Sequence, residues 1–266
     1  MQEGTASRTA MGAARLRAAH QVLDGGRVFA DPFALRILGV DASDLAAEGD
    51  ADRSRRALRW FIACRSRFAE DALALAGSRQ VVILGAGLDT YAYRHPQFAG
   101  RIFEVDHPAT QQWKRERLAA AGIEVPDNLT FTPVDFERQV LAHELAHSGF
   151  DDTQATFFTW LGVVPYLSEP AIYDTLAFIA ALPGGAHIAF DYANPDSGQQ
   201  ALERRVAEAG EALQTYFETE PFVARLRALG FRAIEDLSPR DIAARYMKRQ
   251  IENERGGHLM HAATLD

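Results

Sequence analysis

The sequence predicts an α/β domain built around a doubly wound, mostly parallel β-sheet. From residue 80 onward, short runs of β-branched and aromatic residues alternate with helical stretches, which implies parallel strands joined by right-handed crossovers. The first run leads directly into Gly85-Ala86-Gly87. Glycines at the end of a strand let the backbone turn tightly and let a ligand approach the main chain. We therefore expect a ligand pocket over Gly85 and Gly87.

The first 78 residues are expected to be helical. Apolar spacing with few glycines or prolines favours helices over 7–22 and 54–76. Asp31-Pro32 starts a short helix between them, because proline suits a first helical turn. Residues 41–53 are polar, acidic and small, which predicts a loop. We interpret residues 1–78 as a helical lid over the strand ends.

The rest of the chain supplies the sheet and its flanking helices. Parallel strands are expected at 81–84, 101–105, 129–132, 156–160 and 186–191. Helices are expected between them at 108–121, 137–147 and 169–181, followed by two helices after Pro195 and closing strands at 231–237 and 258–265. We interpret 79–195 as a cofactor-binding core, 196–230 as a helical insert and 231–266 as closing strands of a single domain, 1–266.

Composition and charge exclude several classes of protein. The 266 residues are 47% hydrophobic and 24% charged, as in ordinary globular proteins, and a net charge of -8 disfavours a nucleic-acid partner. No stretch approaches the ~20 apolar residues of a membrane span, and no secretion signal is evident, so we expect a cytoplasmic protein. Cys64 is the only cysteine and follows Ile62-Ala63, which predicts a small buried side chain rather than a nucleophile.

Acidic residues at two strand ends indicate a nucleoside ligand. Asp106 lies 19 residues after Gly87, where a carboxylate accepts hydrogen bonds from ribose hydroxyls. Asp135-Phe136 follows the third strand and suits an adenine amine and ring face, although a helix cap explains Asp135 equally well. Thr90 stands where a dinucleotide fingerprint has its third glycine. This favours S-adenosylmethionine, which has no pyrophosphate, and leaves an NAD-dependent oxidoreductase as the alternative of the same fold.

Together these motifs resemble a known family. The quoted segments are Val81-Val-Ile-Leu-Gly-Ala-Gly-Leu-Asp-Thr90 with Tyr93-Arg94, Phe103-Glu-Val-Asp-His-Pro108 with Lys114, Val134-Asp-Phe136, and Thr159-Trp-Leu-Gly-Val-Val-Pro-Tyr-Leu167. They resemble the leucine carboxyl methyltransferase-like family of S-adenosylmethionine-dependent O-methyltransferases, above all its bacterial branch, associated with polyketide and other secondary metabolism. The resemblance covers nearly the whole chain. It implies a class I methyltransferase (Rossmann-like) sheet of seven strands with the last antiparallel.

The resemblance also assigns roles to residues. It implies that Gly85 lies against the methionine part of the cofactor, that Asp106 holds the ribose, and that Asp135 with Phe136 holds the adenine. Arg65 matches an arginine used toward the cofactor carboxylate, although Arg67 is close enough to leave the register open. Arg8 is a weaker candidate of the same kind.

One position departs from the family pattern, and it bears on the acceptor. Leu161 stands where many members carry a glutamate associated with the cofactor's amino group, so a main-chain carbonyl near Trp160 is expected to make that contact. The same change argues against protein phosphatase tails as the substrate. Tyr166 and Tyr192 follow the fourth and fifth strands, where we expect a small-molecule acceptor, a carboxylate or a hydroxyl, to enter. A protein that binds the cofactor without turnover is a further alternative.

A zinc hydrolase is the remaining alternative. His143-Glu-Leu-Ala-His147 matches the His-Glu-x-x-His motif, with Glu144 as base. The extended motif requires glycine and histidine where this chain has Phe150 and Thr153. The predicted fold also places this helix on the outer surface. We therefore expect no metal.

Overall fold

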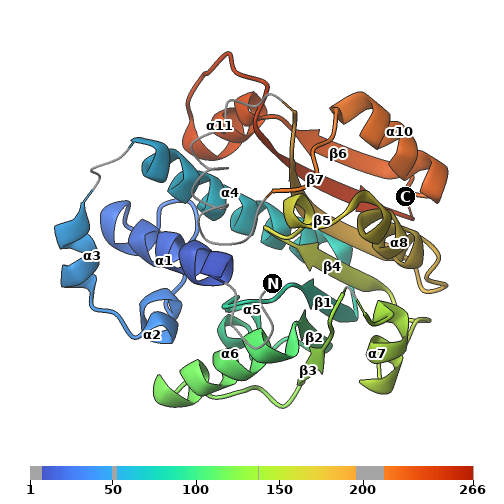
Figure 1. The fold of residues 1–266 in the computed structure, drawn as a ribbon, viewed down its shortest axis with the longest axis horizontal. Helices are drawn as coiled ribbons and strands as arrows, with labels where there is room; N and C mark the ends of the chain where they lie inside the picture. The colour runs from blue at the N-terminus through green and yellow to red at the C-terminus, as the bar shows by residue number, and fades with distance from the viewer. Residues whose placement is uncertain (1–7, 50–52, 137, 196–212, 266) are drawn as a thin grey trace.

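A seven-stranded sheet forms the centre of the protein (Figure 1). The computed structural model describes residues 8–49, 53–136, 138–195 and 213–265. The strand order is β3-β2-β1-β4-β5-β7-β6, and β7 runs antiparallel to both of its neighbours. The strands are β1 (Gln80–Leu84), β2 (Arg101–Asp106), β3 (Leu129–Pro133), β4 (Thr156–Trp160), β5 (Ala186–Ala193), β6 (Ala233–Leu237) and β7 (Gly257–Ala263). The predicted fold class is confirmed.

The strand order fixes where a ligand can bind. After β1 the chain builds outward through β2 and β3, then returns to the other side of β1 with β4. In open sheets of this kind, the loops that leave β1 and β4 diverge and open a crevice at the carboxyl ends of the strands. This reversal lies beside Gly85, as the glycine motif predicted.

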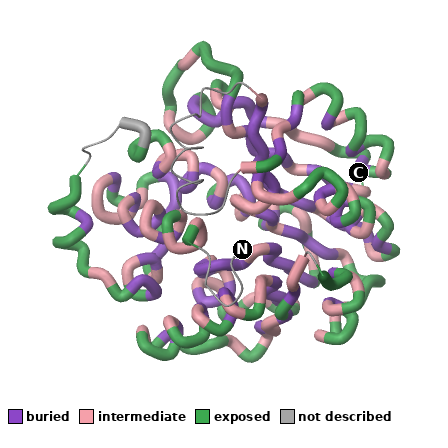
Figure 2. The backbone as a smooth tube through the Cα atoms, in the orientation of Figure 1, coloured by how far each residue is buried: buried purple, intermediate pink, exposed green. Residues whose placement is uncertain are grey.

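Helices cover both faces of the sheet, so that most residues of the strands are buried (Figure 2). One apolar core joins α4, α6 and α11 to the sheet, and a second joins α7, α8 and α10 to its opposite face. Because both faces are covered, β1 is buried at all five positions and is an unbroken apolar run after Gln80. The described helices are α1 (Arg8–Leu23), α2 (Ala34–Leu38), α3 (Ala42–Glu48), α4 (Arg53–Ala76), α5 (Tyr91–Arg94), α6 (Pro108–Ala120), α7 (Leu141–His147), η1 (Val164–Tyr166), α8 (Glu169–Ala180), α10 (Thr219–Leu229) and α11 (Pro239–Met247).

Some predicted boundaries were wrong. Residues 42–48 form helix α3 rather than a loop, because Leu45 packs into the core while the polar residues around it face outward. Helix α7 begins at Leu141, because the chain first turns at Asp135, whose carbonyl accepts from the amides of Arg138 and Gln139. The earlier of the two helices predicted after Pro195 falls on 196–212, outside the described residues.

None of the helices in the described part of the chain combines the length and the apolar content that a membrane span needs.

A buried polar network fastens the N-terminal helices to the loop after β1. Arg17 on α1 donates to the Asp31 carboxylate at 2.7 Å and to the Leu88 carbonyl at 2.5 Å. The Thr90 hydroxyl donates to the same carboxylate at 2.7 Å. Asp31 is only 2% exposed, so its charge depends on these donors rather than on water. The network therefore sets the position of α1 over the glycines.

Loss of this network is expected to destabilise the protein. Arg17→Ala removes the cation paired with Asp31, and breaking one side of a buried ion pair costs roughly 3 kcal/mol. Arg15 on the same helix pairs with Glu48 at the surface. The matched change Arg15→Ala should therefore cost less than about 0.5 kcal/mol. Urea unfolding followed by circular dichroism measures both, and equal losses would contradict this role of Arg17.

Candidate cofactor site

A cavity of about 410 Å³ lies at the carboxyl ends of the strands, where their order reverses. Its walls come from α1, α4, the loop after β1, the ends of β2 and β3, and the loop after β4. We call residues 85–89, which follow β1, the glycine loop. Six of the predicted residues line the cavity together, as does Tyr166; the six are Arg65, Gly85, Gly87, Asp106, Asp135 and Phe136.

The glycine loop has no room for a side chain at Gly85 or at Gly87. Gly85 has a φ of 64°, and a Cβ there would lie 2.3 Å from Cγ2 of Val163. A Cβ on Gly87 would lie 3.0 Å from the Cβ of Ala10 on α1. The backbone itself therefore forms this wall, so a ligand can approach the main chain.

Asp106 is bound to the glycine loop. Its carboxylate accepts from the Gly87 amide at 2.5 Å and from the His107 amide at 2.7 Å. Burial raises the pKa of Asp106, and the two amides, with nearby Lys114, oppose that shift. Each carboxylate oxygen has a second lone pair, so the group can still accept hydrogen bonds from a ligand.

Asp135 and Phe136 occupy the turn after β3. The Nε of Arg138 lies 3.8 Å from the Asp135 carboxylate, and Arg138 also lines the cavity. The side chain of Asp135 is 25% exposed, in keeping with a place at the rim. Phe136 is half-buried beside it.

The structure distinguishes the candidate arginines. Arg65 lines the cavity, and its Nη1 donates to Asp191 at 3.1 Å. Arg67 points away from this cavity and pairs with Asp71 at 2.7 Å on the surface of α4. Arg8 is exposed, while the next residues of α1, Thr9 and Ala10, line the cavity.

Tyr192 does not belong to this site. It is 1% exposed, and its hydroxyl bonds to Thr219 and to Asp236, each at 2.9 Å. Alternation along β5 places Tyr192 in the core on the α8 and α10 side of the sheet, while its neighbour Asp191 faces α4. Tyr166 lines the cavity from η1 and remains the aromatic candidate.

Asp191 is a polar residue of this region that the sequence analysis missed. It accepts from Arg65 and, at 2.5 Å, from the Gly162 amide in the loop after β4. The signal was present, because Asp191 closes the predicted strand 186–191 just as Asp106 follows the second. Its partner on α4, 126 residues away, was not visible in the sequence.

The His-Glu-x-x-His motif lies elsewhere. His143 and His147 are exposed on α7, which packs on the sheet through Leu141 and Leu145. No group of three possible metal ligands occurs among the residues that the structure describes.

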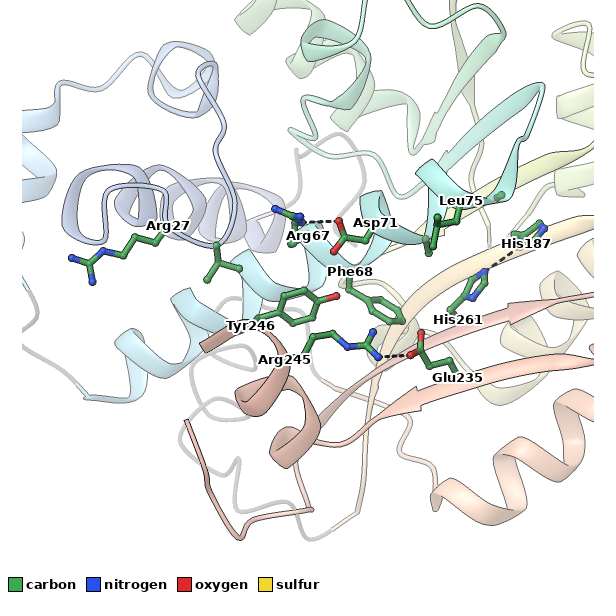
Figure 3. Close-up of a pocket in the computed structure, with 13 residues that line it drawn as sticks. Arg27, Arg67, Phe68, Asp71, Leu75, His187, Glu235, Arg245, Tyr246 and His261 are labelled. Carbon is green, nitrogen blue, oxygen red and sulfur yellow. Dashed lines mark hydrogen bonds and ion pairs between the residues drawn. The ribbon is translucent and has the colours of Figure 1, made fainter. Parts of the chain in front are cut away.

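A second cavity, of about 480 Å³, lies between α4, α11 and the strands β5, β6 and β7 (Figure 3). It shares no lining residue with the first cavity. Two of its arginines are already paired within their own surroundings, one with Asp71 and the other, Arg245, with Glu235 at 2.5 Å. Within each pair the two charges neutralise each other, and the third arginine of the lining, Arg27, is exposed.

Two histidines at the end of the second cavity face each other (Figure 3). His187 Nδ1 lies 3.2 Å from His261 Nε2, and the near-parallel ring centroids are 5.4 Å apart. The two nitrogens therefore lie close to the line that joins the ring centroids, and they point at each other. This geometry suits a hydrogen bond between the rings, whereas binding of one metal ion would require both lone pairs to point at a common site. Burial lowers the pKa of both, that of His261 to about 4.

Comparison with known proteins identifies the family of this chain. A sequence profile of leucine carboxyl methyltransferases matches residues 10–180, which carry α1, the glycine loop, Asp106 and the loop after β4. The chain belongs to the leucine carboxyl methyltransferase family. This confirms the resemblance at the level of the family, and the bacterial branch stays a prediction.

Individual relatives match this family member over part of their length. A putative S-adenosyl-L-methionine-dependent methyltransferase of Bacillus subtilis, YktD, is 33% identical over 198 residues, covering 70% of this chain and 65% of the relative. One of Mycobacterium marinum is 34% identical over 215 residues, covering 75% and 69%. The chain thus spans about two thirds of the length of these curated relatives.

Solved structures share the fold with this leucine carboxyl methyltransferase family member. Magnesium protoporphyrin IX methyltransferase from Synechocystis PCC 6803, with bound SAH, gives a TM-score of 0.51 at 11% identity and covers 94% of this chain and 99% of its own. The CcbJ methyltransferase from Streptomyces caelestis gives 0.50 at 14% identity, covering 75% and 88%. At such low identity these likenesses show the fold alone.

The histidine pair is expected to make the protein acid-sensitive. His261 has a pKa of about 4 in the folded protein and 6.5 as its reference value, so the unfolded chain binds a proton between these pH values that the folded protein does not. The stabilising contribution is complete above pH 6.5 and is lost as the pH falls toward 4. At pH 5 the loss is about 2 kcal/mol.

Substitution isolates this contribution. His261→Asn removes the titrating group, so the wild-type protein should lose more stability than the variant between pH 7 and pH 5. Urea unfolding at both pH values measures the difference. Parallel losses in the two proteins would contradict a depressed pKa at His261.

Proposed function

We propose that this protein is an S-adenosylmethionine-dependent O-methyltransferase that acts on a carboxylate or hydroxyl of a small, natural-product-like molecule. The observation that supports it most is the first cavity, where Asp106, Asp135 and Arg65 converge around the glycine loop at the reversal of strand order. Family membership supplies the methyl-transfer chemistry. A role in polyketide or other secondary metabolism and a cytoplasmic location stay predictions.

The cofactor is S-adenosylmethionine, and the residues of the cavity fit it. We assign the ribose hydroxyls to Asp106, which lines the cavity and whose carboxylate oxygens can each accept a further hydrogen bond. We assign the adenine to Asp135 and Phe136, and the carboxylate of the methionine part to Arg65. Gly85 leaves the backbone open beside that part. With S-adenosylmethionine in place of a dinucleotide, the oxidoreductase alternative loses its support.

The chemistry requires little of the protein beyond positioning. The sulfonium supplies a methyl group whose bonding electrons leave with sulfur, so the leaving group needs no proton. The residues of the chain must hold the acceptor oxygen in line and keep water out. Tyr166, Leu167 and Val163 border the cavity beside the loop after β4, where we place the acceptor.

The described lining favours a carboxylate acceptor over a phenol or alcohol. A carboxylate is already ionised and needs no base, whereas a hydroxyl benefits from one within hydrogen-bond reach. His107 lines the cavity, but its Nδ1 accepts from the Ala109 amide and caps helix α6. Asp106 is assigned to the ribose, and Asp89, which also lines the cavity, accepts from the Tyr91 amide. A small organic acid is therefore the first acceptor class to test.

The proposal is tested in two steps. Isothermal titration with S-adenosylhomocysteine first measures cofactor binding; absence of binding would remove the proposal. Incubation with methyl-labelled S-adenosylmethionine and a panel of small carboxylic acids and phenols then follows label transfer. Tight binding with no transfer to any panel member would support a binding protein without turnover instead.

Asp106→Asn is expected to weaken S-adenosylhomocysteine binding about 100-fold, because charge-assisted hydrogen bonds to two ribose hydroxyls are lost. Titration calorimetry gives the affinity, and circular dichroism confirms that the fold is retained. Glu116→Gln provides the matched control, because Glu116 is exposed on α6 and lies outside the cavity. Unchanged affinity of the Asp106 variant would show that the ribose assignment is wrong.

A further inference from the structure

Three elements meet at the carboxylate of Asp191. Its Oδ2 accepts from Nη1 of Arg65 on α4 at 3.1 Å, and its Oδ1 accepts from the Gly162 amide in the loop after β4 at 2.5 Å. The side chain of Asp191 is 7% exposed and that of Arg65 is 13% exposed. The carboxylate is therefore held by two donors from separate parts of the chain, in a largely dry setting.

The guanidinium of Arg65 is also confined by its contact with Gly162. A Cβ at Gly162 would lie 2.6 Å from Nη1 and 2.7 Å from Nη2, so the guanidinium rests against the bare Cα of the glycine. Gly162 thus donates its amide hydrogen to Asp191, and its lack of a side chain leaves room for the guanidinium of Arg65. Together the two contacts fix the guanidinium, which would otherwise sample many rotamers.

We propose that Asp191 is a positioning residue, which holds Arg65 in the orientation that binds the carboxylate of the cofactor's methionine part. The inference rests on the proposed function. Arginine has five N–H donors, and the contact with Asp191 engages Nη1, which leaves the others for the cavity that Arg65 lines. Because the guanidinium is already ordered, binding the cofactor carboxylate costs less side-chain entropy.

The pair does not act as a simple neutralised ion pair at the surface. Arg67 and Asp71, two residues and six residues further along α4, form such a pair, with side chains 53% and 43% exposed and outside this cavity. They supply a matched control, because the same aspartate-to-asparagine change there breaks an arginine contact of similar length on the same helix. Only the contact at Asp191 is expected to affect ligand binding.

The test compares two ligands that differ only in the methionine tail. S-adenosylhomocysteine carries the amino-acid carboxylate, whereas 5′-methylthioadenosine has the same nucleoside and sulfur without it. In Asp191→Asn, the side-chain oxygen can still accept from Gly162, but the amide nitrogen is a donor that faces the donor Nη1 of Arg65. Calorimetry is expected to show roughly tenfold weaker binding of S-adenosylhomocysteine. Binding of 5′-methylthioadenosine should be unchanged, and Asp71→Asn should change neither affinity.

A double variant separates positioning from a direct role. Arg65→Gln should weaken S-adenosylhomocysteine binding at least as much as Asp191→Asn does. The double variant should bind no more weakly than Arg65→Gln alone, because both changes remove the same contact with the ligand carboxylate. Additive losses would overturn the inference. If Asp191→Asn does not fold, Asp191→Ser, which retains an acceptor for Gly162, is measured with the same two ligands.

The remaining outcomes are distinct. Equal weakening of both ligands by the Asp191 variant would mean that Asp191 supports the cavity as a whole, and no weakening would mean that Arg65 does not depend on it; either overturns the inference. If the wild-type protein binds neither ligand, the proposed function is overturned, and the inference with it.

Discussion

The burial of Asp31 is the constraint on which the arrangement of the site depends. A carboxylate that is 2% exposed must find its hydrogen bonds within the protein, and here it finds them on α1, through Arg17, and beyond the glycine loop, through Thr90. The donors come from segments that the sheet alone would not bring together. Arg17 also donates to the Leu88 carbonyl, so the network connects helix α1 directly to the glycine loop.

Carboxylates that hold a loop through hydrogen bonds recur around the cavity. Asp106 accepts from an amide of the glycine loop, and Asp191 accepts from an amide of the loop after β4. In both cases an acid at or near the carboxyl end of one strand fastens the loop that follows a neighbouring strand. Parallel strands place their loops at one edge, but they do not order them. Short bonds from carboxylates to loop amides supply that order, and they leave the glycine backbone open to a ligand.

Much of the fold could be predicted because buried parallel strands carry a strong signal. The run before Gly85 is apolar at successive positions, and β4 was placed correctly at 156–160. The prediction failed where tertiary packing decides the outcome. A single residue, Leu45, converts a polar stretch into helix α3 by packing in the core. Tyr192 and Asp191 are adjacent, yet only the register of β5 decides which of them faces α4. The choice between Arg65 and Arg67 likewise depended on how α4 is rotated against the sheet.

The position of Cys64 on α4 has a practical consequence. The thiol is fully buried, and burial raises its pKa to about 12. At neutral pH it stays protonated and is inert toward alkylating reagents. Since the chain has no other cysteine, a thiol introduced on the surface of α1 would be the sole point of attachment for a fluorescent or spin label. The natural sequence is thus ready for spectroscopy of its N-terminal helix without prior removal of a native cysteine.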